Sequence, residues 1–224
     1  MTPRQLCFLL LLSQSCTAQT RLYSHGLRTG KNIALTFDAC STTRRPGYDS
    51  AIIHILRELR CPATLFLSGR WIQRYPTVTR ALAKDSLFEL GTHGFSHKLL
   101  TSLPRDSVVG EIQLARSALK KVTGLQSRLF RAPYGAVDSI VLRIVDSLGL
   151  TTIQYDVASG DPDTTFTKER LVMWVTSAAR SGSVVVFHMN GRGWHTAEAL
   201  PEIVGILREK GLRLVRMSEL LRRE

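Results

Sequence analysis

Short apolar runs alternate with amphipathic stretches along most of the chain, and this alternation restricts the possible folds more than any other feature. Residues 32–38, "NIALTFD", are typical of a buried strand, whereas residues 48–59, "YDSAIIHILREL", place apolar residues at helical spacing. The pattern then repeats towards the C-terminus. It predicts strands or strand ends at 63–69, 87–94, 129–135, 150–159 and 182–190, helices at 77–85, 105–124, 137–149, 168–180 and 197–211, and a short strand and turn at 212–221.

Strands that alternate with helices form parallel sheets, because each crossover returns the chain to the same end of the sheet. The strands are almost continuously apolar, which indicates that both of their faces are covered. About seven strand–helix units are enough to close a barrel or nearly close one. Asp49 and Asp106 are placed to cap helices, and Gly124 is placed to end one. We expect one α/β domain from about residue 31 to 221.

Residues 1–18 have the pattern of a signal peptide. A basic residue precedes an apolar run at 6–12, which is too short to span a bilayer, and small residues at Cys16 and Ala18 fit cleavage after Ala18. Acylation of Cys16 is an alternative, although the residues before it match the lipoprotein pattern poorly. We therefore expect an exported protein, periplasmic or extracellular, with no transmembrane segment in the mature chain.

The chain is strongly basic. Its formal net charge is +12, and cleavage after Ala18 would leave +11 because Arg4 is the only charged residue removed. Such a charge could attract an exported protein to anionic cell-wall polymers, acidic glycans or lipid headgroups, or it could serve only to keep the protein soluble. The basic residues are scattered and aromatic residues make up only 7%, so the chain lacks the basic, aromatic platform that binds single-stranded nucleic acid. We expect no nucleic-acid partner.

Cys40 and Cys61 are the two cysteines beyond the signal peptide. Cys40 follows the first predicted strand, and Cys61 precedes the second. If these strands are parallel neighbours, the sulfur atoms lie at opposite ends of the sheet. Five residues of strand separate them by about 16 Å, which is beyond the reach of a disulfide.

Polar residues of chemical use follow several of the predicted strands. In a parallel α/β barrel the carboxyl ends of the strands form one mouth, where active sites are built. One polar residue after a strand is usually a cap, but a series of them at successive strand ends predicts a site. The series consists of Asp38, His93, Arg131, either Asp156 or Asp161, and His188.

The segment "HGFSH" suggests metal binding. His93 and His97 are four residues apart, a spacing that puts two imidazoles on one face of a helix, although a solvated turn has the same spacing. Asp38, at a nearby strand end, is a plausible third ligand. Two imidazoles and an oxygen ligand suit Zn or another transition metal, with positions left open for water and substrate.

Two further segments supply groups that could assist a reaction. Arg131 precedes a Pro-Tyr-Gly turn and could hold a carboxylate in a bidentate fork, while backbone N–H groups of the turn at Tyr134 could face an oxyanion. His188 ends an apolar run and is either a core residue or a general acid, whose pKa a neighbour such as Asp161 could raise. Trp194 could stack on a sugar or pack in the core.

Five segments, "TFDAC", "HGFSH", "RAPYG", "YDVASGD" and "VVVFH", resemble the ordered motifs of the polysaccharide deacetylase family, carbohydrate esterase family 4. The resemblance extends from about residue 32 to 221. "GDPD" and "HMNGRGWHTAEALP" further resemble one bacterial branch of that family, with a TFDAC first motif. The resemblance implies a single distorted, incompletely closed (β/α)7-type barrel. It also implies metal-dependent removal of N- or O-linked acetyl groups from a glycan such as chitin oligomers, peptidoglycan or xylan.

The resemblance also implies a role for each site residue. Asp38 matches the general base that activates the attacking water, and Arg131 matches the residue that tunes that base. The turn at Tyr134 matches the backbone that stabilises the oxyanion. The remaining matches are His93 and His97 as the metal ligands, with Zn as the first choice and Co, Ni or Mn as alternatives. His188 matches the general acid and Asp161 the carboxylate that orients it.

Two positions depart from the family pattern. The first motif usually has two adjacent aspartates, but Ala39 stands at the second, where the family has a metal ligand; Pro162 replaces a usual tryptophan. Three interpretations remain open for the missing ligand. Asp38 ligates the metal itself, Asp49 or His195 completes the shell, or the site binds metal weakly; a Cys40 thiolate ranks below these because hydrolytic sites favour N and O ligands. A non-catalytic glycan-binding protein and an amidase acting on non-sugar C–N bonds are the alternative functions.

Overall fold

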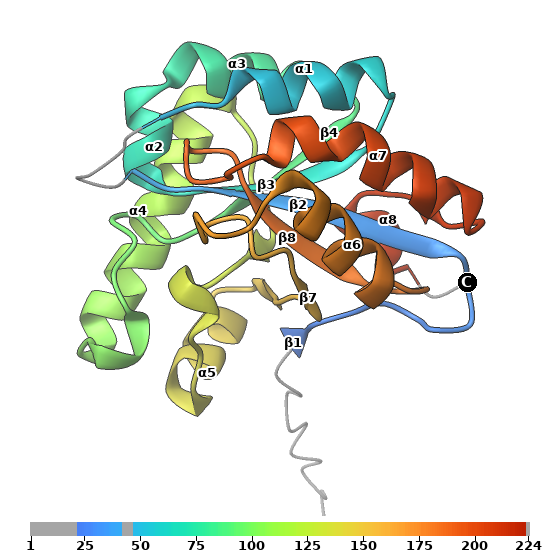
Figure 1. Cartoon of the computed structure of the whole chain (residues 1–224). Coiled ribbons are helices and arrows are strands. Elements are labelled where there is room, and N and C mark those ends of the chain that lie inside the picture. Colours follow the sequence, from blue (N-terminus) through green and yellow to red (C-terminus); the bar gives the residue numbers. More distant parts are fainter. Residues whose placement is uncertain (1–21, 42–46, 223–224) are drawn as a thin grey trace, which may run out of the picture.

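The computed structural model describes residues 22–41 and 47–222, which form a curved sheet of nine strands with helices around it (Figure 1). The strand order is β1-β6-β5-β4-β3-β2-β8-β7, and β9 pairs with β2. All of these pairs are parallel. The strands are β1 (Leu22–Tyr23), β2 (Asn32–Ala39), β3 (Ala63–Leu67), β4 (Phe88–Thr92), β5 (Leu129–Phe130), β6 (Thr151–Ile153), β7 (Val157–Ala158), β8 (Val184–His188) and β9 (Arg213–Leu214).

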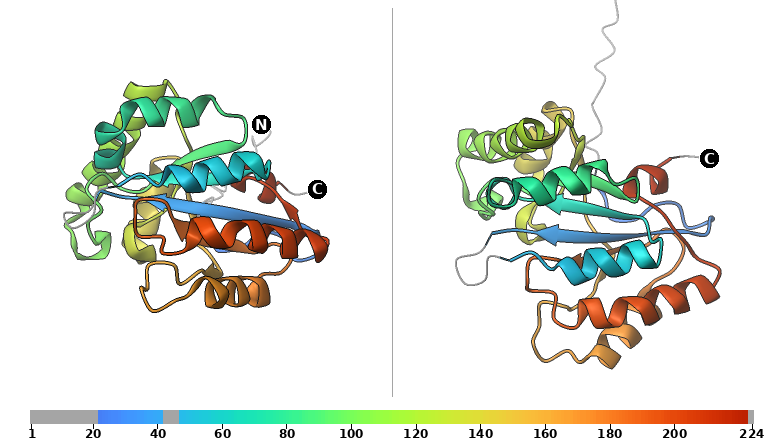
Figure 2. Two further views of the ribbon diagram at one scale, coloured as in Figure 1. Left: turned by 45° about the horizontal axis from the view of Figure 1, so that its top comes forward. Right: turned by 90° about the horizontal axis from the view of Figure 1, so that it is seen from above.

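Most helices pack on the outer side of the sheet (Figure 2), whereas α8 packs on its inner face. The strand order ends at β1 and at β7, so the barrel is not closed by a strand pair between them. Neighbouring helices contact one another in sequence around the outside: α6 packs on α7, α7 on α1, and α4 on α2, α3 and α5. The distorted, incompletely closed barrel is therefore confirmed. The helices are α1 (Ser50–Glu58), α2 (Gly69–Arg74), α3 (Pro76–Lys84), η1 (Leu100–Ser102), α4 (Arg105–Thr123), η2 (Pro133–Gly135), α5 (Ser139–Ser147), α6 (Lys168–Ala178), α7 (Thr196–Glu209) and α8 (Met217–Leu220).

Alternation along β2 decides which side chains face the interior. Its odd-numbered residues, Ile33 to Ala39, belong to the large apolar cluster beneath the helices, whereas Ala34 belongs to the inner cluster with residues of α8. Successive side chains of a strand point to opposite faces, so Asp38 shares the inner face with Ala34. The carboxylate of Asp38 thus faces the mouth of the barrel. Ala39 points away from it and packs in the core.

Local chemistry explains most helix boundaries. The side chain of Asp49 accepts a hydrogen bond from the backbone N–H of Ala51 at the start of α1, as predicted. Gly124 ends α4 in the left-handed conformation, with φ of 78°. The prediction for Asp106 is wrong, because Pro104 occupies the cap position and Asp106 lies within the first turn. In the first turn its negative charge still interacts favourably with the positive end of the helix dipole.

The single strand predicted at 150–159 is wrong in one respect, because it divides into β6 and β7. The residues between β6 and β7 pass from one edge of the sheet to the other. Gln154 N–H donates to the carbonyl of Tyr23 in the edge strand β1, and Asp156 N–H donates to the carbonyl of Val184 in β8, next to the opposite edge strand β7. The apolar run covers both strands, so periodicity alone does not reveal the break. The short elements β1 and α2 were not predicted either.

Several predictions concern the ends of the chain and its cysteines. Cys40 and Cys61 are both buried and free. Among the helices in residues 22–41 and 47–222, none is both long and apolar enough to cross a membrane. The signal peptide at 1–18, its cleavage site and Cys16 lie outside the described residues, and the domain limits 31 and 221 stay a prediction.

Candidate active site

A cavity of about 170 Å³ lies at the carboxyl ends of β2, β4 and β8. Larger cavities exist elsewhere, for example one of about 680 Å³ beside α4 and α5, but that one is lined by no histidine. The cavity at the strand ends differs in combining a carboxylate with three histidines. It is lined by Asp38, Cys40, His93, His97, Tyr134, Gly135, Tyr155, Val186, His188 and Arg192.

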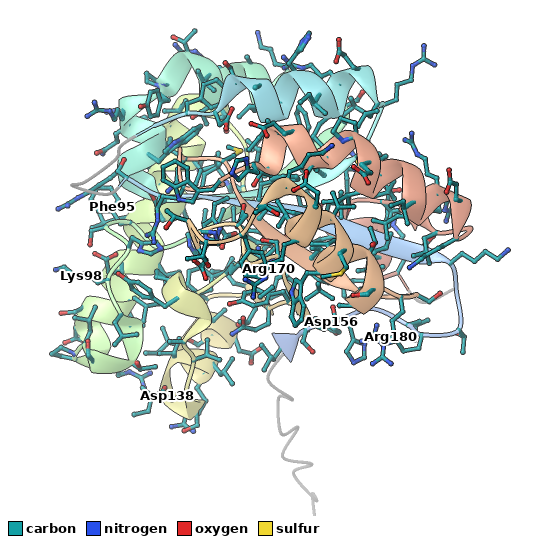
Figure 3. The ribbon with its side chains drawn as sticks, in the orientation of Figure 1. Phe95, Lys98, Asp138, Asp156, Arg170 and Arg180 are labelled. Atoms are coloured by element: carbon teal, nitrogen blue, oxygen red, sulfur yellow. The ribbon has the colours of Figure 1, made fainter. Side chains whose placement is uncertain are left out.

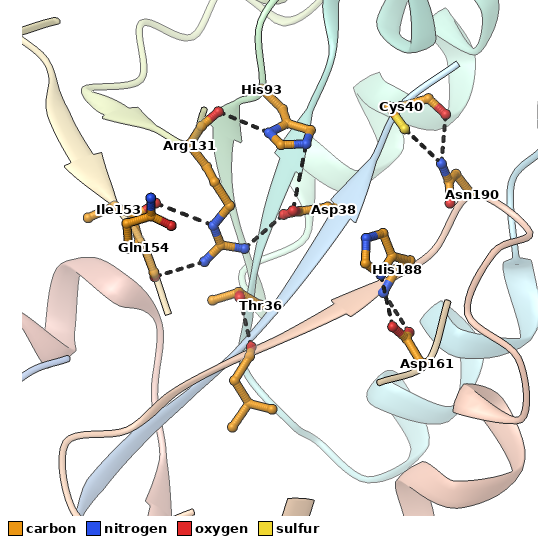
Figure 4. A network of polar contacts seen from close by, with 11 residues as sticks. Thr36, Asp38, Cys40, His93, Arg131, Ile153, Gln154, Asp161, His188 and Asn190 are labelled. Atoms are coloured by element: carbon orange, nitrogen blue, oxygen red, sulfur yellow. Dashed lines mark hydrogen bonds and ion pairs between the residues drawn. The ribbon is translucent and has the colours of Figure 1, made fainter. Parts of the chain in front are cut away.

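Asp38 is held by an arginine at the centre of this cavity (Figure 4). Nη1 of Arg131 donates to Oδ1 of Asp38 at 2.8 Å, and both residues are buried. The remaining guanidinium N–H groups donate to the carbonyls of Ile153 and Gln154. The guanidinium therefore binds one carboxylate oxygen, not the two of a bidentate fork, and Oδ2 stays available for other partners.

The charges around Asp38 keep it ionised. Burial by itself raises the pKa of Asp38, but the positive charge and hydrogen bond of Arg131, together with electrostatic interactions with His93 and His188, outweigh burial. The pKa of Asp38 consequently lies below its usual value. The group is a carboxylate throughout the neutral range.

His93 and His97 do not lie on one helix, as the spacing had suggested, but on the loop between β4 and η1. His97 is in the left-handed region, with φ of 60°, and the two ring centroids are 4.9 Å apart. Nδ1 of His93 donates to the carbonyl of Arg131 at 2.9 Å, an orientation that leaves Nε2 as an acceptor 3.6 Å from Oδ2 of Asp38. A tight turn, the alternative that the spacing had left open, brings the two histidines together.

Both imidazoles are neutral at neutral pH. Burial is the largest cause for each, and it outweighs the attraction of Asp38, so the pKa of His93 is lowered. Burial and the neighbouring His93 lower the pKa of His97 to about 3. Neutral imidazoles with an exposed lone pair are metal ligands.

The donor chemistry of this cavity fits a divalent metal ion, although the protein supplies few ligands. Two ligands at about 2.0–2.1 Å from a tetrahedral ion lie about 3.3 Å apart, close to the separation of His93 Nε2 from Asp38 Oδ2. Residues 22–41 and 47–222 nevertheless contain no group of three His, Cys, Asp or Glu side chains placed to hold a metal. Ala39 supplies no ligand, because its side chain has no donor atom, and its methyl group packs in the core.

The other residues considered as replacement ligands are poorly placed. Asp49 caps α1 and His195 pairs with Glu198, and neither lines the cavity. Cys40 does line it, but burial and the charge of Asp38 raise its thiol pKa to about 11. Its sulfur also accepts a hydrogen bond from Asn190 at 3.1 Å. Binding a metal through Cys40 would require loss of this proton from a buried thiol and of the Asn190 hydrogen bond.

His188 and Asp161 form the second pair of the site. Nδ1 of His188 donates to Oδ1 of Asp161 at 2.8 Å, and the His188 backbone N–H donates to Oδ2 at 2.7 Å. Ser159 and Thr196 also donate to this fully buried carboxylate. Burial by itself lowers the pKa of His188, but the Asp161 hydrogen bond and charge outweigh it, so the pKa is raised.

Gly193 allows this pair to form. A Cβ at position 193 would lie 2.2 Å from the carbonyl oxygen of His188 and 2.9 Å from Oδ2 of Asp161. Only a residue without a side chain fits so close to both groups. The glycine therefore brings the chain after β8 against the buried carboxylate.

The alternative Asp156 lies elsewhere in the structure. Its carboxylate accepts from Arg28, Ser183 and Val184 at the start of β8, whereas His188 ends that strand. Figure 3 labels it beside β7. Of the two candidate aspartates, Asp161 is thus the one that contacts a histidine of the cavity.

Tyr134 and Trp194 take different positions. Tyr134 lines the cavity with φ of 61°, its side chain is 65% exposed, and its ring centroid is 4.7 Å from that of His97. Trp194 is half-buried and does not line the cavity; its backbone N–H donates to Asp161. The backbone at Trp194 therefore contacts the backbone of Asp161, the partner of His188.

Residues 25–153, more than half of the chain, match the family model for polysaccharide deacetylase. The chain belongs to the polysaccharide deacetylase family. A chitooligosaccharide deacetylase of Azorhizobium caulinodans is 30% identical over 196 residues, which cover 82% of this chain and 91% of that protein. The family assigned from the motifs is therefore confirmed.

Solved structures of this family share the fold. A family 4 carbohydrate esterase pseudoenzyme from Bacillus anthracis superposes with a TM-score of 0.82 at 24% identity, covering 91% of this chain and 70% of that chain. A mutant of that pseudoenzyme with restored enzymatic activity gives a TM-score of 0.81 at 26% identity, covering 91% and 72%. The first of these likenesses supports the fold alone.

Two residues of this polysaccharide deacetylase cavity were missed from the sequence. Tyr155 follows β6, and its ring lies 5.6 Å from the guanidinium carbon of Arg131. Arg192 lies in the loop after β8 and is exposed. Both lie inside family-like motifs, "YDVASGD" and "HMNGRGWHTAEALP". Their position within these motifs is the one sequence feature that points to the site.

Proposed function

We propose that this chain is a hydrolase that removes acetyl groups from a glycan, and that Asp38 and His188 are its base and acid. The observation that carries the proposal is the pairing in one cavity of an ionised carboxylate held by Arg131 with a histidine held by Asp161. Their environments push the two pKa values apart, so that one group accepts a proton while the other holds one.

His93 and His97 would hold a divalent ion, with Zn as the first choice and Asp38 as the carboxylate nearest to them. When bound, such an ion polarises the acetyl carbonyl and makes water more acidic. Asp38 needs this assistance, because a carboxylate with a lowered pKa is a weak base toward ordinary water. Because Asp38 is the single carboxylate near the two histidines, we expect them to hold the ion weakly.

The residues divide the hydrolysis between them. Asp38 accepts a proton from the attacking water as a C–O bond forms to the acetyl carbon, and backbone N–H groups at Tyr134 face the oxyanion. The C–N or C–O bond to the sugar then breaks. His188 gives its proton to the leaving amine or alkoxide, and acetate is released. Asp161 keeps the His188 ring in the donating orientation.

The cavity admits only part of a polymer. A volume of about 170 Å³ corresponds to a few water molecules at about 30 Å³ each, which suits an acetyl group and its sugar attachment. The rest of the glycan must lie outside, across exposed side chains such as Tyr134. Chitin oligomers, peptidoglycan and acetylated xylan remain the candidate substrates, met outside the cytoplasm if residues 1–18 direct export.

Acetate release from these three glycans by the purified chain, with and without a chelator, tests the function. The deacetylase proposal expects release that the chelator abolishes. A folded protein that binds chitin oligomers but releases no acetate would instead be a glycan-binding member of the family. Ala39, and the absence of a group of three ligands from the part of the chain that the structure describes, favour this second function.

The acid role of His188 predicts a pH effect for Asp161→Asn. Since the folded pKa of His188 is raised above its usual 6.5, the proton persists above that pH and is lost only as pH rises through the raised value. Without the carboxylate charge, burial lowers the pKa, so the alkaline limb of kcat/KM should move to lower pH. Asp163→Asn, which alters an exposed turn carboxylate nearby, should leave the profile unchanged. An unmoved alkaline limb in Asp161→Asn contradicts the assignment.

Arg192 predicts a preference for acidic glycans. It is an exposed cation on a cavity whose one lining carboxylate, within the described part of the chain, is already paired with Arg131. Arg192→Gln should raise KM up to about five-fold for peptidoglycan, whose stem peptides carry free carboxylates, because exposed pairs contribute up to about 1 kcal/mol. KM for neutral chitin oligomers should not change. Arg180→Gln, an exposed arginine outside the cavity, is the matched control; equal KM changes for both glycans would contradict the prediction.

A further inference from the structure

We propose that Glu111 of α4 is a positioning residue for the histidine pair, an inference that rests on the proposed function. Glu111 is 8% exposed, although it is charged and lies on a surface helix. Its Oε2 accepts from the backbone N–H groups of Phe95 at 3.1 Å and Ser96 at 2.8 Å. Its Oε1 accepts from the Ser96 hydroxyl at 2.5 Å. One carboxylate thus takes three hydrogen bonds from the loop between the two histidines.

The loop has an unusual backbone that needs such support. Gly94 and His97 both have positive φ, 66° and 60°. A non-glycine residue held in this region costs on the order of 1 kcal/mol and persists only where its surroundings fix it. Hydrogen bonds to an ionised acceptor are about twice as strong as neutral ones. Glu111 is the charged acceptor that stabilises this turn.

The opposite side of the loop is fixed by backbone and packing. Gly69 and Arg70, at the start of α2, donate their N–H groups to the carbonyls of Gly94 and Phe95. A Cβ at Gly69 would lie 2.2 Å from the Phe95 ring, so that ring packs directly on α2. Figure 3 labels Phe95 on the side of the molecule that carries α2 and α4. The loop is therefore clamped between α2 and the Glu111 carboxylate.

The two histidines depend on this clamp to different degrees. The ring of His93 is oriented by its hydrogen bond to the carbonyl of Arg131. The ring of His97 makes no hydrogen bond among residues 22–41 and 47–222, and only the His93 and Tyr134 rings contact it edge-on. Its direction consequently follows from the backbone that Glu111 holds. We infer that loss of Glu111 acts on the ion site chiefly through His97.

Glu111→Ala tests this inference by two measurements that need no substrate. Titration with Co²⁺, followed by its absorption bands, should show an affinity about 10- to 100-fold lower than that of the unaltered chain, the loss typical when a ligand's supporting contact is removed. Hydrogen exchange should accelerate in residues 93–99 and not elsewhere. Where the variant is active, kcat should fall more than KM rises. Ser96→Ala, which removes one of the three bonds, should change both readouts less and in the same direction.

Glu89→Ala is the matched control for a lost carboxylate. Glu89 accepts from the Thr64 hydroxyl at 3.1 Å and the Ser218 backbone N–H at 3.0 Å, close to α8 and away from the histidines. It should lower stability and leave Co²⁺ affinity unchanged. Equal affinity losses in the Glu89 and Glu111 variants, or unaltered exchange at 93–99 in Glu111→Ala, would overturn the inference. If the unaltered chain binds no Co²⁺, the proposed metal site fails, and exchange alone decides the role of Glu111.

Discussion

Replacing Asp38 with Asn is expected to lower kcat for acetate release by about 10²- to 10⁴-fold, the usual contribution of a positioned base. Asn keeps the shape of the side chain and an oxygen for the Arg131 hydrogen bond, but it cannot accept the proton of water. The change also removes the counter-charge of a fully buried guanidinium, so stability should fall as well. Acetate release at saturating substrate, with folding checked by circular dichroism, measures the effect.

Asp156→Asn provides the control for this variant. Asp156 also accepts a 2.8 Å contact from an arginine, Arg28, but lies away from the cavity. It should cost stability and leave kcat close to that of the unaltered chain. Near-normal kcat in a folded Asp38→Asn protein would contradict the role of Asp38 as base.

Replacing His188 with Ala is expected to reduce deacetylation of a sugar amide by about 10²- to 10⁴-fold, because no group then protonates the leaving nitrogen. The size of the loss should depend on the leaving group. A p-nitrophenolate leaves without a proton, so hydrolysis of p-nitrophenyl acetate should fall much less. Asp38→Asn should impair both substrates, since each reaction needs an activated water.

His195→Ala is the comparison for His188→Ala. His195 lies seven residues further along, pairs with Glu198 at 3.1 Å and does not line the cavity. It should preserve hydrolysis of both substrates. Equal losses on the sugar amide and on p-nitrophenyl acetate in His188→Ala would show that the histidine does not act as the acid.

The position of the site could be predicted from the sequence because a parallel barrel gathers its strand ends. Four of the predicted residues each follow an apolar run. Three of them line one cavity, and the fourth pairs with one of these three: Asp38, His93, His188 and, paired with Asp38, Arg131. The strand pattern alone does not choose between Asp156 and Asp161, since both follow the same run, and only the family resemblance assigned the role to Asp161. The choice depends on where the chain crosses the open side of the barrel between β6 and β7.

Three other features were beyond sequence patterns for physical reasons. A spacing of four fits a helix and a tight turn equally, so the left-handed backbone of His97 was not foreseen. Glu111 looks like an ordinary surface charge of an amphipathic helix, and only the fold of the loop 93–99 gives it partners. The side of the sheet on which Ala39 lies depends on whether β2 continues as far as this residue. It does, so its methyl group packs in the core.

The central claim is that a cavity with one carboxylate in its first motif still holds an ion and hydrolyses acetyl groups. The most direct measurement is acetate release from chitin oligomers by the metal-stripped chain during stepwise addition of Zn²⁺, with bound zinc measured at each step. We predict that release rises with bound zinc and reaches a plateau near one ion per chain. Full activity in the stripped chain, or one zinc bound with no acetate released from chitin oligomers, peptidoglycan or xylan, would contradict the claim.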